Sequence, residues 1–184
     1  MEASLVEPDP PDPQWPRYSS WAFPPYRFVQ GRAPHPKRHP HGHSYGKVEP
    51  LPEAFPPEQW RDSEWYLYGV DLYNYAYWWE CHEVFESLWH AVGEKTEQGR
   101  FFQALIQIAA ANIKRWSGVP HAAASLQNSG LEKLRTMPPE YMGMNVARLV
   151  EDVEHYFQGR RSEPALIRLN VYSGQTFPPA GKDR

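Results

Sequence analysis

Residues 97–117, EQGRFFQALIQIAAANIKRWS, decide the fold of the chain. When this segment is drawn as a helix, apolar or small side chains cover most of its circumference, and Gln103, Gln107 and Lys114 form its polar stripe. A helix that is apolar on nearly all sides is surrounded by other elements. We therefore predict a central, largely buried helix, which Gly118 and Pro120 end.

Helical patterns also occupy the flanking segments. Residues 61–92 predict one or two helices, residues 121–136 another and residues 145–158 a last one. Gly130 stands in the middle of the third pattern, where it costs stability, so we expect a close approach of two backbones there. Short connections between consecutive amphipathic helices favour antiparallel neighbours. The predicted fold class is all-α, a small antiparallel helical bundle.

Proline divides the chain into unlike regions. Fourteen of the twenty prolines precede residue 58, too many for a helix or a central strand to persist there. Aromatic side chains in the same region would stay exposed to water in a disordered tail, so we expect this region to wrap the helices and bury them. The predicted organisation is an arm at 1–58, disordered over its first dozen residues, a helical domain at 59–160 and an extended C-terminal tail at 161–184.

Charge and cysteine content limit the possible environments. The formal net charge is −3 and the pI is about 6.2, so nothing favours binding to nucleic acid or to an anionic membrane surface. No stretch is apolar enough to span a bilayer, and the N-terminus lacks the pattern of a signal peptide. Cys81 is the only cysteine, which excludes an internal disulfide. We expect a soluble protein of the reducing cytoplasm.

The segment 79–90, WECHEVFESLWH, contains the residues most suggestive of chemistry. His82 and Glu86 are i, i+4 neighbours, so their side chains meet on one helix face. A helical wheel places Trp78, Trp79 and Trp89 on that same face, and Glu80, Ser87 and Glu94 away from it. A carboxylate among such apolar neighbours must be hydrogen-bonded, ion-paired or bound to a ligand; Asn112 of the central helix is one candidate partner.

Three interpretations of this pair remain open. As metal ligands, an imidazole nitrogen and a carboxylate oxygen suit zinc, iron, manganese or nickel, with Glu83 or His90 as weaker additional ligands. A glutamate held beside a histidine in apolar surroundings also suits acid–base catalysis. In the third interpretation, the pair is a buried brace that only orients helices. The HExxH zinc motif is excluded, because Glu86 stands where its second histidine is required.

The arm adds a second group of histidines, at positions 35, 39, 41 and 43. Imidazoles this close together can chelate a divalent metal, whereas the plainer interpretation is a proline-rich loop that His43 and Tyr45 anchor by hydrogen bonds. If the arm folds over the helix that carries His82, His43 becomes a candidate third group beside His82 and Glu86.

The pattern His82-x-x-x-Glu86-x-x-Trp89, followed by FFQALIQIAAA at 101–111, resembles the domain of unknown function 309 family, whose signature is HxxxExxW. The resemblance covers about residues 62–160. It implies an all-α bundle and a motif suspected of metal binding, in which His82 and Glu86 are ligands and Trp89 packs against them. Members often have a histidine near the end of the second helix, where this chain has Asn112 and Lys114.

Two hypotheses of different classes follow from these residues. The first is a helical protein that binds a divalent metal at His82 and Glu86, with hydrolytic or acid–base activity. The second is a non-catalytic interaction module, in which an aromatic surface of the arm or the polar stripe of the central helix contacts a partner such as another copy of the chain. A third and fourth ligand converging on the pair would favour the first hypothesis, and an exposed aromatic patch would favour the second.

Overall fold

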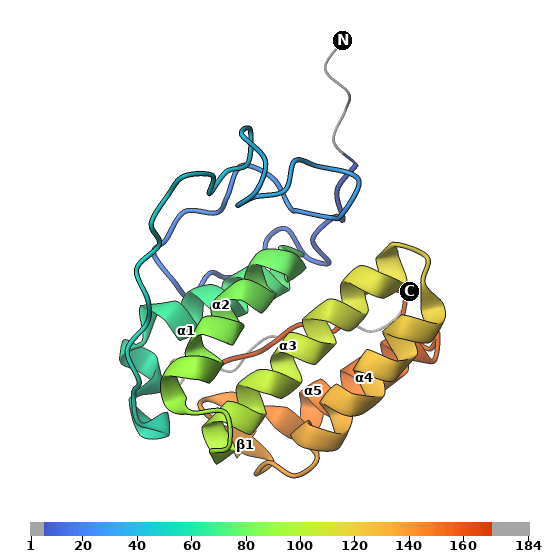
Figure 1. Cartoon of the computed structure of the whole chain (residues 1–184). Helices are drawn as coiled ribbons and strands as arrows, with labels where there is room; N and C mark the ends of the chain where they lie inside the picture. The colour runs from blue at the N-terminus through green and yellow to red at the C-terminus, as the bar shows by residue number, and fades with distance from the viewer. Residues whose placement is uncertain (1–5, 171–184) are drawn as a thin grey trace.

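The computed structural model describes residues 6–170, which form a helical bundle crossed by an extended N-terminal arm (Figure 1). The helices are η1 (Pro57–Asp62, a 3-10 helix), α1 (Glu64–Asn74), α2 (Trp78–Val92), α3 (Glu97–Trp116), α4 (Pro120–Leu134) and α5 (Val146–Phe157). Two short antiparallel strands, β1 (Glu140–Tyr141) and β2 (Met144–Asn145), precede α5. The predicted all-α bundle with a wrapping arm is confirmed.

The helix ends follow from local chemistry. The hydroxyl of Ser63 accepts a hydrogen bond from the amide of Tyr66 at the start of α1, and Thr96 and Asn145 cap α3 and α5 in the same way. Ala76, with φ at 63°, separates α1 from α2, which resolves the predicted pattern at 61–92 into two helices. Gly93, with φ at 94°, ends α2.

α3 is the central element, as its sequence predicts. It lies between α2 and α4 (Figure 1) and buries Phe101, Phe102, Leu105 and Ile108 completely. Gly130 of α4 explains the closeness of its contact with α3, because a Cβ there would lie 2.7 Å from Cδ1 of Ile108 and 3.1 Å from the carbonyl oxygen of Ala104. The predicted close approach at Gly130 is confirmed.

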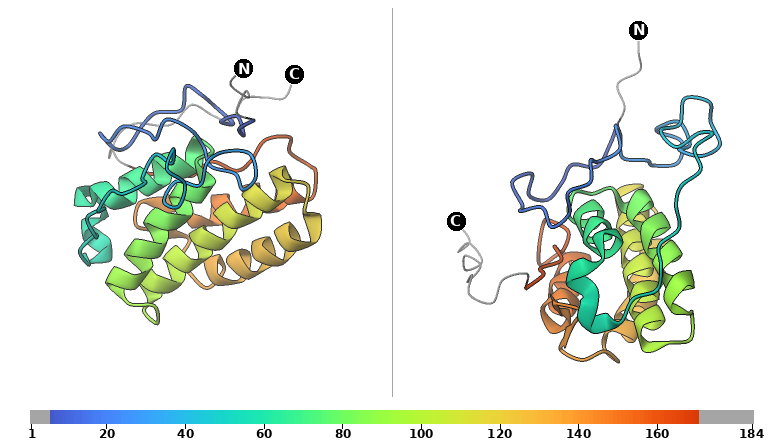
Figure 2. Two further views of the ribbon diagram at one scale, coloured as in Figure 1. Left: turned by 45° about the horizontal axis from the view of Figure 1, so that its top comes forward. Right: turned by 90° about the vertical axis from the view of Figure 1, so that its left-hand side faces the viewer.

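One buried carboxylate fixes the N-terminal arm to the bundle. Asp71 of α1 is fully buried and accepts hydrogen bonds from Nε of Arg17 (2.8 Å), the amides of Tyr18 (2.8 Å) and Ser19 (2.9 Å), and the Ser19 hydroxyl (2.7 Å). Each carboxylate oxygen thus finds donors, and the cost of burying its charge is offset. Figure 2 shows the arm lying over the helices beyond residues 17–19.

One turn further along α1, Asn74 holds the C-terminal segment. Its Nδ2 donates to the carbonyl oxygen of Ile167 at 2.8 Å, and its Oδ1 accepts from the Ile167 amide at 2.7 Å. Ile167 and Leu169 are buried, and the amide of Leu169 donates to the hydroxyl of Tyr18 in the arm. Residues 161–170 are therefore part of the folded body, whereas the rest of the predicted tail lies outside the described residues.

The start of the arm is also in contact with the rest of the protein. Glu7 forms an ion pair with Arg27 at 3.3 Å, and Pro8 is buried. Of the dozen residues predicted to be disordered, 1–5 lie outside the described part of the chain. Within residues 6–170, no helix combines the length and the apolar character needed to cross a membrane.

Replacing Asp71 with Ala is expected to destabilise the protein by about 3 kcal/mol, because it leaves the donors of residues 17–19 without their acceptor. Urea unfolding measures this change, and tryptic cleavage of the arm is expected to accelerate in parallel. Asp62→Ala is the matched control: Asp62 is exposed at the end of η1, and its loss is expected to shift stability by less than about 0.5 kcal/mol. Equal effects of the two substitutions would contradict the role given to Asp71.

Candidate functional site

α2 buries a different face from the one that its aromatic residues predict. Its buried apolar side chains are Trp78, Cys81, Val84, Phe85 and Leu88, and the carboxylate of Glu80 is buried with them. Trp79, His82, Glu86 and Trp89 are only partly buried. The prediction was wrong by about one residue position, roughly 100° around the helix.

The arm is the physical reason for this difference. α2 is covered on one side by the bundle and on another by residues of the arm, so it has two sheltered faces. The Trp79 ring packs against Phe28 and His35 of the arm, with centroids 5.1 and 5.4 Å away. A helical wheel assigns all aromatic residues to a single buried face, whereas part of the aromatic surface of α2 is used to hold the arm.

On the outer flank of α2, His82, Glu83 and Glu86 come together. Each offers one ligand atom, and these atoms lie within 4.8 Å of one another. The side chains of His82 and Glu83 are 31% and 26% exposed, and Nδ1 of His82 stands 3.7 Å from Oε1 of Glu83. Nδ1 itself is buried and has no hydrogen-bond partner in the described structure. An imidazole nitrogen without a partner beside two carboxylates can accept a cation.

The interpretation of His82 and Glu86 as a buried brace is wrong. Both side chains are partly exposed on the flank of α2, and no hydrogen bond or ion pair joins them among the described residues. The i, i+4 spacing does place the two side chains on one side of α2, but that side is partly exposed and does not face the core.

Lys37 connects the arm to this group. Its Nζ lies 2.5 Å from Oε2 of Glu83 and 3.5 Å from Oε2 of Glu49. Burial alone would raise the pKa of the Glu83 carboxyl, but the neighbouring His82 and Lys37 outweigh it and lower that pKa to about 2. Glu83 is therefore an anion at every physiological pH.

His43 lies against Glu80 rather than beside His82 and Glu86. Its Nε2 is 3.2 Å from Oε1 of Glu80, its Nδ1 is 3.0 Å from the hydroxyl of Ser44, and the amide of Phe28 donates to the same Glu80 oxygen at 3.0 Å. The expectation that Glu80 points away from the sheltered side is wrong. No sequence signal identified this carboxylate, because its donors, Phe28 and His43, lie 52 and 37 positions away in the sequence.

Glu80 is only half satisfied in this position. Its Oε2 is buried and has no hydrogen-bond partner within the described part of the chain. Burial raises the pKa of the Glu80 carboxyl, although the hydrogen bonds from His43 and Phe28 act in the opposite direction. A buried carboxylate oxygen without a hydrogen-bond partner lowers the stability of the fold, so its presence in a native structure calls for an explanation.

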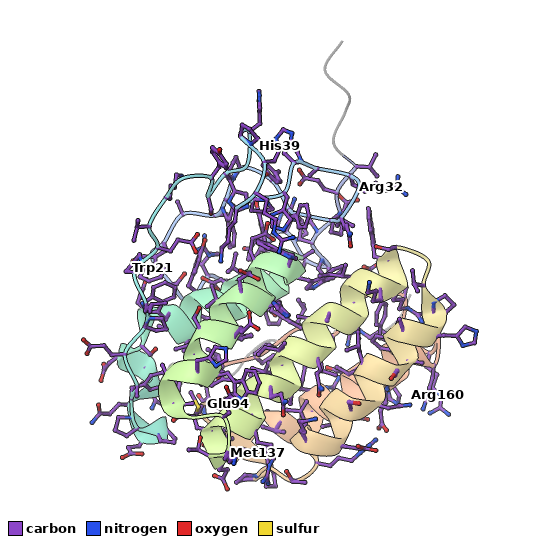
Figure 3. The ribbon with its side chains drawn as sticks, in the orientation of Figure 1. Trp21, Arg32, His39, Glu94, Met137 and Arg160 are labelled. Atoms are coloured by element: carbon purple, nitrogen blue, oxygen red, sulfur yellow. The ribbon has the colours of Figure 1, made fainter. Side chains whose placement is uncertain are left out.

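The other predicted residues lie apart from both groups. His90 is exposed and contacts Glu94, with Nδ1 and Oε1 3.0 Å apart, while the Trp89 ring lies against His90. Asn112 is buried and donates to the hydroxyl of Tyr73 at 3.4 Å. His39 lies at the outer end of the arm (Figure 3), where its ring centroid is 5.5 Å from that of His41.

A cavity of about 660 Å³ lies between the arm and the helices α1 and α2. Glu80 and Glu83 both line it, so it adjoins both groups described above. Aromatic side chains of the arm and of the two helices contribute much of the remaining wall: Trp21, Trp65, Tyr68 and Trp79.

Replacing His43 with Ala is expected to lower the free energy of unfolding by about 1–2 kcal/mol, because Glu80 loses one of its two donors. Chemical denaturation measures the loss, and faster tryptic cleavage after Lys37 and Arg38 would report loosening of the arm. His41→Ala removes an exposed imidazole two positions away in the same loop and is expected to change stability by less than about 0.5 kcal/mol. If the two variants had the same free energy of unfolding and the same rate of tryptic cleavage, the contact between His43 and Glu80 would not hold the arm.

One part of the chain is similar to a known protein family. A family model described as Domain of unknown function (DUF309) matches residues 66–126, which begin in α1, include α2 and α3 and end in α4. The match contains the whole HxxxExxW pattern but is shorter than the 62–160 expected from the resemblance. No curated protein and no solved structure matches the chain. Residues 66–126 are thus similar to the domain of unknown function 309 family, in agreement with the resemblance given by the HxxxExxW pattern.

Proposed function

We propose that His82, Glu83 and Glu86 bind a divalent metal ion on the outer flank of α2. The observation that carries the proposal is the convergence of three ligand atoms within 4.8 Å. Nδ1 of His82 is in addition buried and has no hydrogen-bond partner among the described residues. One nitrogen and two carboxylate oxygens suit zinc, iron, manganese or nickel better than the larger calcium ion.

The residues present fit a catalytic rather than a structural metal site. Three protein ligands leave coordination positions open, and the partial exposure of His82 and Glu83 lets solvent and substrate reach them. A metal ion at such a site lowers the pKa of a bound water and polarises a carbonyl or phosphoryl oxygen. The reaction class we propose is therefore hydrolytic or acid–base, in the reducing cytoplasm that the single cysteine favours.

Lys37 has two roles in this arrangement. Its ammonium orients the Glu83 carboxylate, and it also competes for the charge that a metal ion would use. The ammonium remains close to the open side of the group, where it can stabilise negative charge on a substrate. The arm is thus part of the proposed site.

Metal content tests the proposal directly. Untagged protein supplied with zinc, manganese, iron or nickel is expected to retain one ion per chain by elemental analysis, and His82→Ala with Glu86→Ala is expected to lose it. The chain offers a matched control in His90→Ala with Glu94→Ala, which removes an exposed histidine–glutamate pair of the same spacing at the C-terminal end of α2 and in the turn that follows it. A wild type without metal, or a control that loses as much metal as the test variant, would overturn the proposal.

Removing the competing ammonium is expected to strengthen metal binding. Lys37→Met should lower the Kd of the preferred ion about two- to fivefold, because Glu83 is released from its ion pair. Titration against a chromogenic chelator measures the Kd. Lys47→Met is the control, since Lys47 lies on the same arm and forms no ion pair among the described residues. Weaker binding by Lys37→Met would instead show that Lys37 holds Glu83 in its ligating position.

A further inference from the structure

The cavity between the arm and the helices α1 and α2 has the size of a small-molecule site. Its volume is about 660 Å³, and pockets for small ligands are generally about 300–1,000 Å³. Its walls come from two regions that are distant in the sequence, since Trp21 and Pro24 belong to the arm and Trp65 and Tyr68 belong to α1. It exists only because the arm is docked.

Aromatic rings dominate one part of this cavity. Trp21 packs edge-on against Trp65, with ring centroids 4.9 Å apart and planes at 85°, and its centroid is 5.3 Å from that of Tyr68. Trp79 of α2 contributes a further indole to the wall. All four side chains are only partly buried, so they retain surface that a ligand can cover. Trp21 projects from the arm beside the helices in Figure 3.

The charges around the cavity favour a cation. Glu80 lines it with a carboxylate that is 6% exposed and whose Oε2 has no hydrogen-bond partner in the described structure. Lys37 also lines it, but this single ammonium is shared between Glu83 and Glu49, two further carboxylates of the lining. Lys47 contributes one exposed ammonium. A cation inside the cavity would feel the field of Glu80 through a wall of low dielectric constant.

We propose that this cavity binds a small organic ammonium ion, such as a quaternary or methylated amine. Faces of tryptophan and tyrosine attract such cations through the ring quadrupole, and a nearby carboxylate supplies the compensating charge. An anionic ligand would meet three carboxylates against two ammonium groups, one of them already paired. His43 and the Phe28 amide contact Oε1 of Glu80, and a ligand without positive charge would add no compensating charge for the carboxylate oxygen Oε2, which has no hydrogen-bond partner in the described structure. This site shares Glu83 with the proposed metal group, but the binding of an ammonium ion requires no metal.

Choline and 3,3-dimethylbutan-1-ol, which share a shape and differ in charge, provide the first test. With a chelator present to keep the metal group empty, choline chloride is titrated into the millimolar range, and the tryptophan indole signals are followed by ¹H–¹⁵N NMR. Phe substitutions assign the signals of the eight tryptophans. We expect saturable shifts for Trp21, Trp65 and Trp79 with choline, and at least about fivefold weaker binding of the neutral alcohol. Equal binding of the two, or choline shifts no larger than those with equimolar sodium chloride, would overturn the proposal.

Two variants then test the wall of the cavity. Glu80→Gln keeps the shape and removes the charge, while Trp65→Leu removes an aromatic face from α1; each is expected to weaken choline binding about five- to tenfold. Glu94→Gln and Trp116→Leu are the matched controls, because they make the same chemical changes away from the cavity and are expected to leave the Kd unchanged. The dispersion of the remaining indole signals verifies that each variant is folded. Unchanged choline binding by a folded Trp65→Leu protein would also overturn the proposal.

Discussion

The buried carboxylate of Asp71 is the interaction on which the rest of the structure depends. It collects four donors from residues 17–19, and these contacts anchor the arm on α1. Asn74, one turn later, fixes the C-terminal segment through both atoms of its amide. Two polar side chains of a single helix thus organise both extended segments, because each satisfies backbone groups that would otherwise be buried without partners.

The docked arm contributes side chains or backbone groups to the metal-binding group, to the surroundings of Glu80 and to the aromatic cavity. Lys37 reaches Glu83 of the metal-binding group, His43 and the amide of Phe28 reach Glu80, and Trp21 closes the aromatic cavity. The matched family segment at 66–126 contains the helices that contribute to these sites, but it does not include the arm. The chemistry we propose therefore combines helices of the matched segment with an arm outside it.

Much of the fold could be predicted from the hydrophobic periodicity of the sequence and from the positions of glycine and proline. Gly118 and Pro120 correctly end the central helix, and Gly130 correctly indicates a close helix contact, because these residues act through local backbone geometry and through volume. The aromatic content of the arm correctly implied burial. The orientation of α2 could not be predicted in this way, because its tryptophans are divided between the bundle and the arm, and hydrophobicity does not distinguish these two environments.

The candidate site was predictable only where its residues are neighbours on one helix. Spacing brings His82 and Glu86 together, and Glu83 joins them on the same flank. The contact between Lys37 and Glu83 spans 46 positions and that between His43 and Glu80 spans 37. Pairings at such separations depend on the path of an irregular segment, for which a single sequence contains no periodic signal.

The distance along the chain between Asp71 and its donors has a consequence for how the protein is made. The donors precede their acceptor by 52–54 positions, so during synthesis the arm leaves the ribosome well before α1 exists. Contacts of this separation form late, because the loop between them must first be closed. Until then the rings of the arm remain in water, and its prolines, which do not support helix or sheet, keep it from settling into an ordered alternative. The newly made arm therefore lacks the contacts that bury its aromatic side chains until α1 has been synthesised.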